Sequence, residues 1–134
     1  MNGLEATLAS WHPRILSVLR IMAGLLLLQF GLTKHFSFPM TYPGKLEPFS
    51  MIWFAGAIEL VAGVLLVLGL FTRCAAFVCA GLMAFAYFIG HAPQGFYPIQ
   101  NGGTLAILFC FVFFYLFFAG GGPWSVDAMR SNKA

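Results

Sequence analysis

The sequence predicts an all-α membrane protein, in which one domain over residues 1–134 forms a bundle of four membrane-spanning helices. Hydrophobic residues make up 60% of the chain and charged residues only 8%. A soluble domain needs charged residues at about a quarter of its positions, so this chain cannot cover itself with a polar surface. Four apolar stretches, each about long enough to cross a ~30 Å hydrocarbon core as a helix, set the number of spans. Strands are excluded, because an open sheet edge leaves backbone groups unpaired in lipid.

Turn-forming residues separate the four spans, which we expect at positions 14–33, 51–71, 74–90 and 102–119. Three prolines (39, 43 and 48) fill the first loop, and HAPQGFYPIQN forms the loop between the third and fourth spans. Only Thr72 and Arg73 separate the second span from the third, which predicts a tight turn. After the fourth span, three glycines and Pro123 end the helix, and Ser125 is expected to cap a short amphipathic helix.

The basic residues predict how the chain is oriented. The side that holds both termini would carry four of them, Arg14, Arg73, Arg130 and Lys133. The opposite side would carry two, Lys34 and Lys45. Because basic residues gather on the cytoplasmic side of membrane proteins, we expect both termini in the cytoplasm. Trp53 and Trp124 are expected to anchor the chain at the membrane–water interfaces.

The first two spans resemble each other. LRIMAGLLLLQFGLTK, from position 19, aligns with IELVAGVLLVLGLFTR, from position 58, at an offset of 39 residues. The alignment places Ala23-Gly24 on Ala62-Gly63 and Arg20 on Glu59. Small pairs of this kind permit close helix approach. The sequence leaves open whether the similarity is an inverted repeat of the transporter kind or reflects the low complexity of apolar segments.

Glu59 is an acidic residue within the second span, where a charge costs about 2.5–3.5 kcal/mol and must find a partner. Direct pairing with Arg20 is not favoured, because the two residues would lie about 12 Å apart along the membrane normal. Other polar residues share the layer of Glu59 near the outer surface: Gln29, Lys34, His35, His91 and Asn101. We therefore expect a small polar pocket open toward the outer leaflet. The alternative is that these groups only satisfy one another, with Lys34 extended to the surface.

The residue types in this layer suit hydrogen bonding to a quinone carbonyl or hydroxyl, or a proton relay, with Glu59 as the central group. His35 and His91 would also be able to ligate haem, although loop contacts explain them equally well. The three cysteines form no CxxC and no Cys/His ligand pattern, so no metal site is predicted. Arg20 and Arg73 are expected to have structural roles. No basic cluster points to nucleic acid.

The two aligned segments, together with NGG at 101–103 and GGGPWSVD at 120–127, resemble the DoxX family of small four-helix membrane proteins over nearly the whole chain. By this resemblance, the family's recurring residues fall on Arg20, Lys34, Glu59, Arg73, Asn101, Gly102, Trp124, Ser125 and Asp127. One position departs from the pattern. Many relatives carry an acidic residue soon after the Asn-Gly, where this chain has Gly103 and Thr104, so a second carboxylate is missing.

The resemblance implies a protein of the plasma (inner) membrane, linked to respiratory or sulfur redox chemistry. The family's namesake is a subunit of a quinone-reducing thiosulfate oxidoreductase, and other members are connected with oxidative-stress complexes. Our leading hypothesis is an integral membrane subunit or partner of a redox system that binds a quinone-like ligand near Glu59. The chain has no evident cofactor of its own and no self-contained redox centre, so enzymatic activity is left open. The alternatives are a non-catalytic accessory subunit of a larger membrane complex, and a small transporter that forms homo-oligomers.

Overall fold

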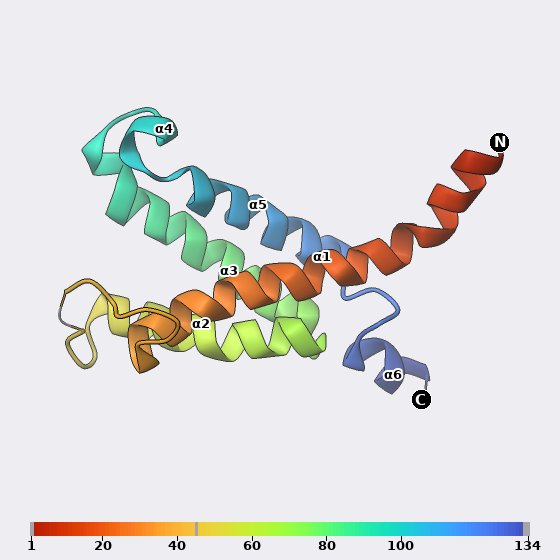
Figure 1. Cartoon of the computed structure of the whole chain (residues 1–134), viewed down its shortest axis with the longest axis horizontal. Coiled ribbons are helices and arrows are strands. Elements are labelled where there is room, and N and C mark those ends of the chain that lie inside the picture. Colours follow the sequence, from red (N-terminus) through yellow and green to blue (C-terminus); the bar gives the residue numbers. More distant parts are fainter. Residues whose placement is uncertain (1, 45, 133–134) are drawn as a thin grey trace.

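In the computed structural model, residues 2–44 and 46–132 are described, and every regular element among them is helical (Figure 1). Lys45 and Lys133, on which the expected orientation partly depends, lie outside the described residues. The elements are α1 (Gly3–Phe36), α2 (Met51–Leu68), α3 (Thr72–Ala86), η1 (Tyr87–His91), η2 (Ala92–Gln94), α4 (Pro98–Asn101), α5 (Thr104–Ala119) and α6 (Val126–Asn132). Three stretches are long and apolar enough to cross a membrane: α1, α2 and the continuous helical segment Thr72–Gln94. The apolar helix α5 is shorter, with 16 residues.

Helix α1 begins well before the expected position 14. Its N-terminus is closed by a capping box, in which the Asn2 side chain accepts from the Glu5 backbone N–H and the Glu5 side chain accepts from the Asn2 N–H. Pro13 lies inside the helix without ending it. Proline lacks the N–H of a helical hydrogen bond and its ring crowds the preceding turn. Figure 1 shows the first turns of α1 bending away from the axis of the rest.

The other helix ends follow from local backbone chemistry. Helix α2 ends at Leu68, three residues before the expected position 71, because Gly69 has a left-handed backbone (φ +74°). Helix α5 starts at Thr104 rather than 102, since Gly102 ends α4 in the same conformation (φ +75°). The third helical stretch continues past the expected position 90 through the π segment η1 and the 3₁₀ turn η2.

Helices α1 and α2 form a pair in close backbone contact. A Cβ atom at Gly24 would lie 2.9 Å from the backbone nitrogen of Val67, and one at Gly63 would lie 3.1 Å from the Cα of Leu28. The two contacts are reciprocal, because Gly24 and Leu28 correspond to Gly63 and Val67 at the 39-residue offset. Five buried residues of α1 correspond at this offset to five residues of α2 that are also buried. On α1 they are Ser17, Arg20, Ala23, Gly24 and Leu27, and on α2 they are Gly56, Glu59, Ala62, Gly63 and Leu66. Glycine therefore determines how closely this helix pair can pack.

Helices α3 and α5 form the second pair, in which small residues of α3 face large residues of α5. Ala76, Cys79 and Phe113 are fully buried between them. The two pairs contact each other through this core and through an edge-to-face contact of Phe30 with Phe109, whose ring centroids are 6.4 Å apart. Helices α2 and α3 meet at the turn that joins them and diverge toward their other ends (Figure 1).

Candidate functional site

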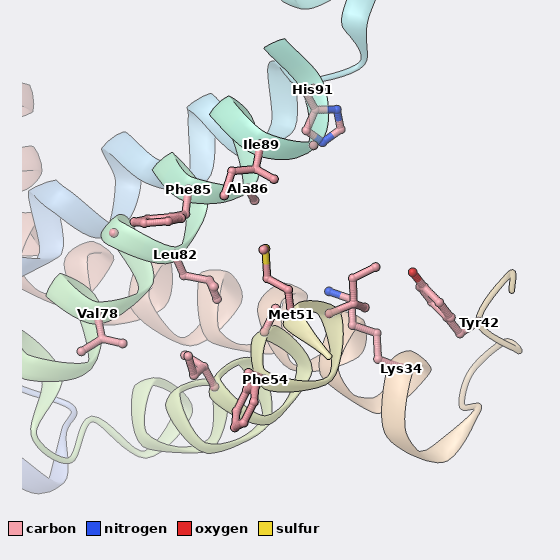
Figure 2. A pocket seen from close by; sticks show the side chains of 15 residues that line it. Lys34, Tyr42, Met51, Phe54, Val78, Leu82, Phe85, Ala86, Ile89 and His91 are labelled. Atoms are coloured by element: carbon pink, nitrogen blue, oxygen red, sulfur yellow. The ribbon is translucent and has the colours of Figure 1, made fainter. Parts of the chain in front are cut away.

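A cleft of about 730 Å³ lies between the diverging helices α2 and α3. Its polar side chains, Lys34, Tyr42 and His91, lie at the wide end beside the loops (Figure 2). The remaining lining residues are apolar or glycine: Met51, Ile52, Phe54, Ala55, Ile58, Val78, Gly81, Leu82, Phe85, Ala86, Ile89 and Gly90. The cleft therefore has an apolar length and one polar end.

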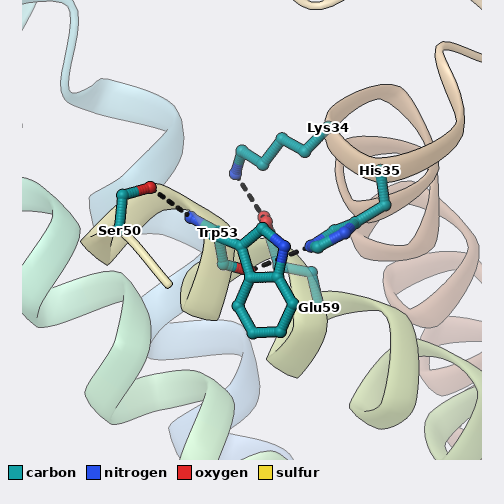
Figure 3. Close-up of polar contacts among 5 residues, drawn as sticks. All are labelled: Lys34, His35, Ser50, Trp53 and Glu59. Carbon is teal, nitrogen blue, oxygen red and sulfur yellow. Dashed lines mark hydrogen bonds and ion pairs between the residues drawn. The ribbon is translucent and has the colours of Figure 1, made fainter. Parts of the chain in front are cut away.

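Lys34 lines one wall of the polar end and forms an ion pair with the buried Glu59 behind it (Figure 3). The Lys34 Nζ lies 2.5 Å from the Glu59 Oε1. Glu59 is 3% exposed and does not line the cleft, whereas Lys34 lies in the last turn of α1 and reaches the cleft surface. Lys34 thus stands between the carboxylate and the cleft. The charges of the two groups cancel at this wall.

His35 lies beside this pair but has a packing role. Its Nε2 is 2.9 Å from the Trp53 carbonyl oxygen, to which it donates, and its ring meets the Trp53 indole edge to face (Figure 3). A Cβ atom at Gly56 would lie 2.7 Å from the His35 ring. The absence of a side chain at Gly56 therefore lets the end of α1 bind the first turn of α2, where the Ser50 hydroxyl accepts from the Trp53 N–H.

The opposite wall carries His91, in the π segment η1. Its Nδ1 is 3.0 Å from the Asn101 carbonyl oxygen. Because a carbonyl only accepts, Nδ1 carries the proton, and in the neutral imidazole Nε2 is left as an acceptor. The π turn shifts the register of the helix where His91 enters the cleft, and such turns are frequent at functional sites.

Asn101 is 3% exposed and holds the adjoining loop together. Its side-chain amide donates to the Tyr87 hydroxyl (3.2 Å) and the Gly95 carbonyl (3.0 Å), while its Oδ1 accepts from the Gly103 N–H (2.8 Å). A Cβ atom at Gly103 would lie 2.5 Å from the Tyr87 ring. The packed tyrosine therefore leaves no room for a side chain at Gly103, one of the two positions at which the resemblance led us to expect an acidic residue.

The six residues predicted to share one polar layer fall into separate groups. Lys34, Glu59 and His35 belong to the α1/α2 side, and His91 and Asn101 to the α3 side. Only Lys34 and His91 line the cleft, and they do so from opposite walls. Gln29 is exposed on α1 and is not among the described residues that line the cleft.

Tyr42 and the apolar walls of the cleft are parts of the site that the sequence did not predict. In the sequence, the one indication of an open wall is Gly81, an isolated glycine within an apolar helix. A Cβ atom there would meet no heavy atom within 4 Å.

A second polar network ties the chain together at the other end of the bundle. Arg20 is 1% exposed and donates to three backbone carbonyls: Leu66 (2.9 Å), Trp124 (2.7 Å) and Gly121. Trp124 itself is half exposed. Arg73 donates to the carbonyls of Phe117 (3.1 Å) and Phe118 (2.6 Å) at the C-terminus of α5, where a cation complements the helix dipole.

Asp127 closes this network from α6. Its two carboxylate oxygens accept from the backbone N–H groups of Phe71 (2.8 Å) and Thr72 (2.9 Å), at the N-terminus of α3. Partial burial acts to raise the pKa of Asp127, but these hydrogen bonds and the charge of Arg130 outweigh it and lower the pKa. The predicted cap of α6 is confirmed, since the Ser125 hydroxyl accepts from the Ala128 N–H at 3.1 Å.

Comparison with known proteins decides the family. Residues 15–92 match the DoxX family model, and this match includes α2, α3 and both walls of the cleft. The chain belongs to the DoxX family. This DoxX protein is 41% identical over 132 residues to an uncharacterized protein of Haemophilus influenzae, covering 95% of this chain and 96% of the relative. It is 28% identical over 144 residues to an uncharacterized membrane protein of Mycobacterium tuberculosis, covering 94% and 86% of the two chains. No solved structure matches the chain.

Family membership and the apolar helices together identify an integral, multi-pass membrane protein. In this DoxX protein the polar groups serve two different ends of the bundle. Arg20 binds backbone carbonyls at one end and is not among the described residues that line the cleft. Lys34 and His91 line the cleft at the other end.

Proposed function

We propose that this DoxX protein is a subunit or partner of a respiratory, quinone-linked redox system and binds a neutral, quinone-like molecule in the cleft between α2 and α3. The single observation that carries the proposal is the form of the cleft, with apolar walls along its length and Lys34 and His91 at one end. Such a space suits a ligand with an apolar body and a small polar head. The redox context comes from the family resemblance alone.

The ion pair favours a head without charge. An anionic headgroup would compete with Glu59 for Lys34 and would leave a buried carboxylate without its partner, which is strongly unfavourable. The ammonium group of Lys34 has three donors and spends one on Glu59, so it is able to donate to a ligand carbonyl. The Nε2 of His91 accepts from a ligand hydroxyl. A ring that carries carbonyl or hydroxyl groups on opposite sides satisfies both walls.

The ligand would enter from the bilayer rather than from water. Lining residues on the flank of the cleft remain exposed, including Phe54 (50%), Phe85 (68%) and Ile89 (49%). In a membrane these side chains contact acyl chains, so a molecule dissolved in the bilayer reaches the cleft sideways, between α2 and α3.

We further propose that α5 is the fourth span and that both termini lie in the cytoplasm, with the protein in the plasma membrane. The two ends of the described chain lie at the same end of the bundle (Figure 1), together with Arg73 and Arg130, whereas Lys34 lies at the other end. A green fluorescent protein fused to the C-terminus is expected to fluoresce, since it matures in the cytoplasm. A dark fusion of normal abundance would contradict this orientation.

The ligand is tested by what leaves the membrane with the protein. Native mass spectrometry of wild-type protein in mild detergent, followed by solvent extraction, is expected to show a bound redox-active isoprenoid. Gly81→Leu places a side chain into the open space of the cleft and should abolish retention. Val64→Phe is the matched control, because Val64 is 45% exposed on α2 and is not a lining residue. Equal retention by both variants, or a phospholipid as the bound species, would contradict the proposal.

The second candidate is an accessory subunit that docks a larger membrane complex. It is favoured by the aromatic surface of α5, where Phe111 and Phe118 are 65% and 64% exposed. On this reading no ligand is retained, Gly81→Leu has no effect, and alanine substitutions at Phe111 and Phe118 release a co-purifying partner.

A further inference from the structure

The first turns of α1 project from the bundle. Every residue from Asn2 to Ile15 is exposed, so the rest of the described chain does not cover this segment. Helix α1 has 34 residues and is therefore about 51 Å long, against a hydrocarbon core of ~30 Å. Its C-terminal end, with Lys34, lies at the wide end of the cleft beside the loops. The excess of about 14 residues thus falls at the N-terminal end, outside the hydrocarbon.

This projecting segment carries an apolar stripe. Leu4, Leu8, Trp11 and Ile15 follow one another at intervals of four, three and four residues, which places them on one helix face. Their side chains are 67%, 60%, 46% and 56% exposed. The same stripe continues along the membrane-crossing part of α1 with Val18 and Met22, which are also exposed. The segment therefore extends the lipid-facing surface of the span beyond the hydrocarbon core.

The segment is also built to be helical without a protein partner. Its N-terminus is closed by the Asn2–Glu5 capping box. The hydroxyls of Thr7 and Ser10 donate to backbone carbonyls one turn earlier, at 2.9 Å and 2.7 Å, so neither needs water as an acceptor. The bend near Pro13 turns the segment off the axis of the span (Figure 1).

We propose that residues 3–13 form an amphipathic helix that lies in the headgroup region of the bilayer, with Leu4, Leu8 and Trp11 turned toward the acyl chains. The Arg14 guanidinium lies over the Trp11 ring, 4.7 Å from its centroid. Tryptophan and arginine are both common where a span meets the membrane–water interface. The occupant of the stripe is the lipid surface rather than a second copy. A coiled coil needs two helices that follow a common axis, and the bend near Pro13 changes the direction of the helix axis within the stripe that runs from Leu4 to Met22.

The test uses the full chain in phosphatidylcholine vesicles, with Trp11 as the only tryptophan. Trp53→Phe and Trp124→Phe remove the other two. Both substitutions keep the backbone carbonyls that accept from His35 and Arg20, and phenylalanine at position 53 keeps an aromatic ring beside His35. Bromine atoms near the headgroup end of the acyl chains should quench Trp11 more than bromines near the chain ends, and aqueous iodide should quench it little.

A matched control places the only tryptophan on the opposite face of the same segment. Ala6→Trp in a Trp11→Phe background should be quenched by iodide and little by the brominated lipids. Leu4→Ser with Leu8→Ser should shift the Trp11 emission to longer wavelength and open it to iodide. The proposal is overturned if Trp11 is quenched by iodide and not by lipid. It is also overturned if Trp11 is shielded from both while Leu8→Cys forms disulfides between copies.

Discussion

Removing either partner of the Lys34–Glu59 pair should have unequal effects on stability, because the two groups differ in burial. Lys34→Met leaves the Glu59 carboxylate, which is 3% exposed, without its partner. Breaking a buried pair in this way costs about 3–5 kcal/mol. Glu59→Gln leaves an ammonium group on a side chain that is 19% exposed and lies in the last turn of α1. That group is able to reach the interface, and the new amide oxygen still accepts from it, so the cost should be about 1 kcal/mol.

The double variant Lys34→Met/Glu59→Gln completes a thermodynamic cycle. It removes both charges, so it should be more stable than Lys34→Met alone, with a coupling energy of about 2 kcal/mol. The free energy of unfolding is measured by titrating sodium dodecyl sulfate into mixed micelles and following tryptophan fluorescence. Equal costs for the two single variants, or a double variant whose cost is their sum, would refute the burial argument.

Three further predictions concern the rest of the bundle. Arg20→Met leaves the carbonyls of Leu66 and Trp124 without their donor and removes one of the two donors to the Gly121 carbonyl, so it should cost about 3 kcal/mol. Trypsin should then cleave faster at Arg130; an unchanged cleavage rate would count against the network. Because the pKa of Asp127 is lowered in the folded protein, its stabilising effect is complete above the ordinary carboxyl pKa of about 3.9. This stabilisation is lost as the pH falls through the lower pKa of the folded state. Amide protection factors in α6 should therefore drop in acid for the wild type, whereas Asp127→Asn should show low protection at neutral pH already. Gly63→Ala should cost about 1–3 kcal/mol in the micelle titration because its Cβ meets Leu28, whereas Gly81→Ala, which meets nothing, should cost little.

Helix positions were largely predictable from the sequence, because apolar runs and Pro/Gly turns are local signals. The helical residues 3–13 that precede the first expected span were not predicted, because they are too polar to resemble a span. Asn2 and Glu5, three residues apart, are the capping signature that would have indicated them. The π segment η1 has no sequence signal of this kind, and its register depends on how His91 and Asn101 meet.

The candidate site was predictable only in part. The depths of Arg20 and Glu59 in their helices disfavour a direct pair, and in the structure Glu59 binds Lys34 while Arg20 binds carbonyls. Hydropathy does not reveal that α2 and α3 diverge, because this depends on the angle between two packed helix pairs. The cleft and its Tyr42 were therefore out of reach of the sequence. Gln29 was assigned by depth alone, which does not fix the side of the helix on which a residue lies.

Because a tight turn joins α2 to α3, a displacement at this end of the bundle changes how far the two helices diverge at the other end. Asp127 holds the N-terminus of α3 from the C-terminal segment. Helix α2 has 18 residues and is about 27 Å long, so a tilt of about 5° at the turn moves its far end by about 2 Å. An affinity tag that pulls on α6 would thus change the width of the cleft at the other end of the bundle. Tags for ligand work are better placed at the N-terminus.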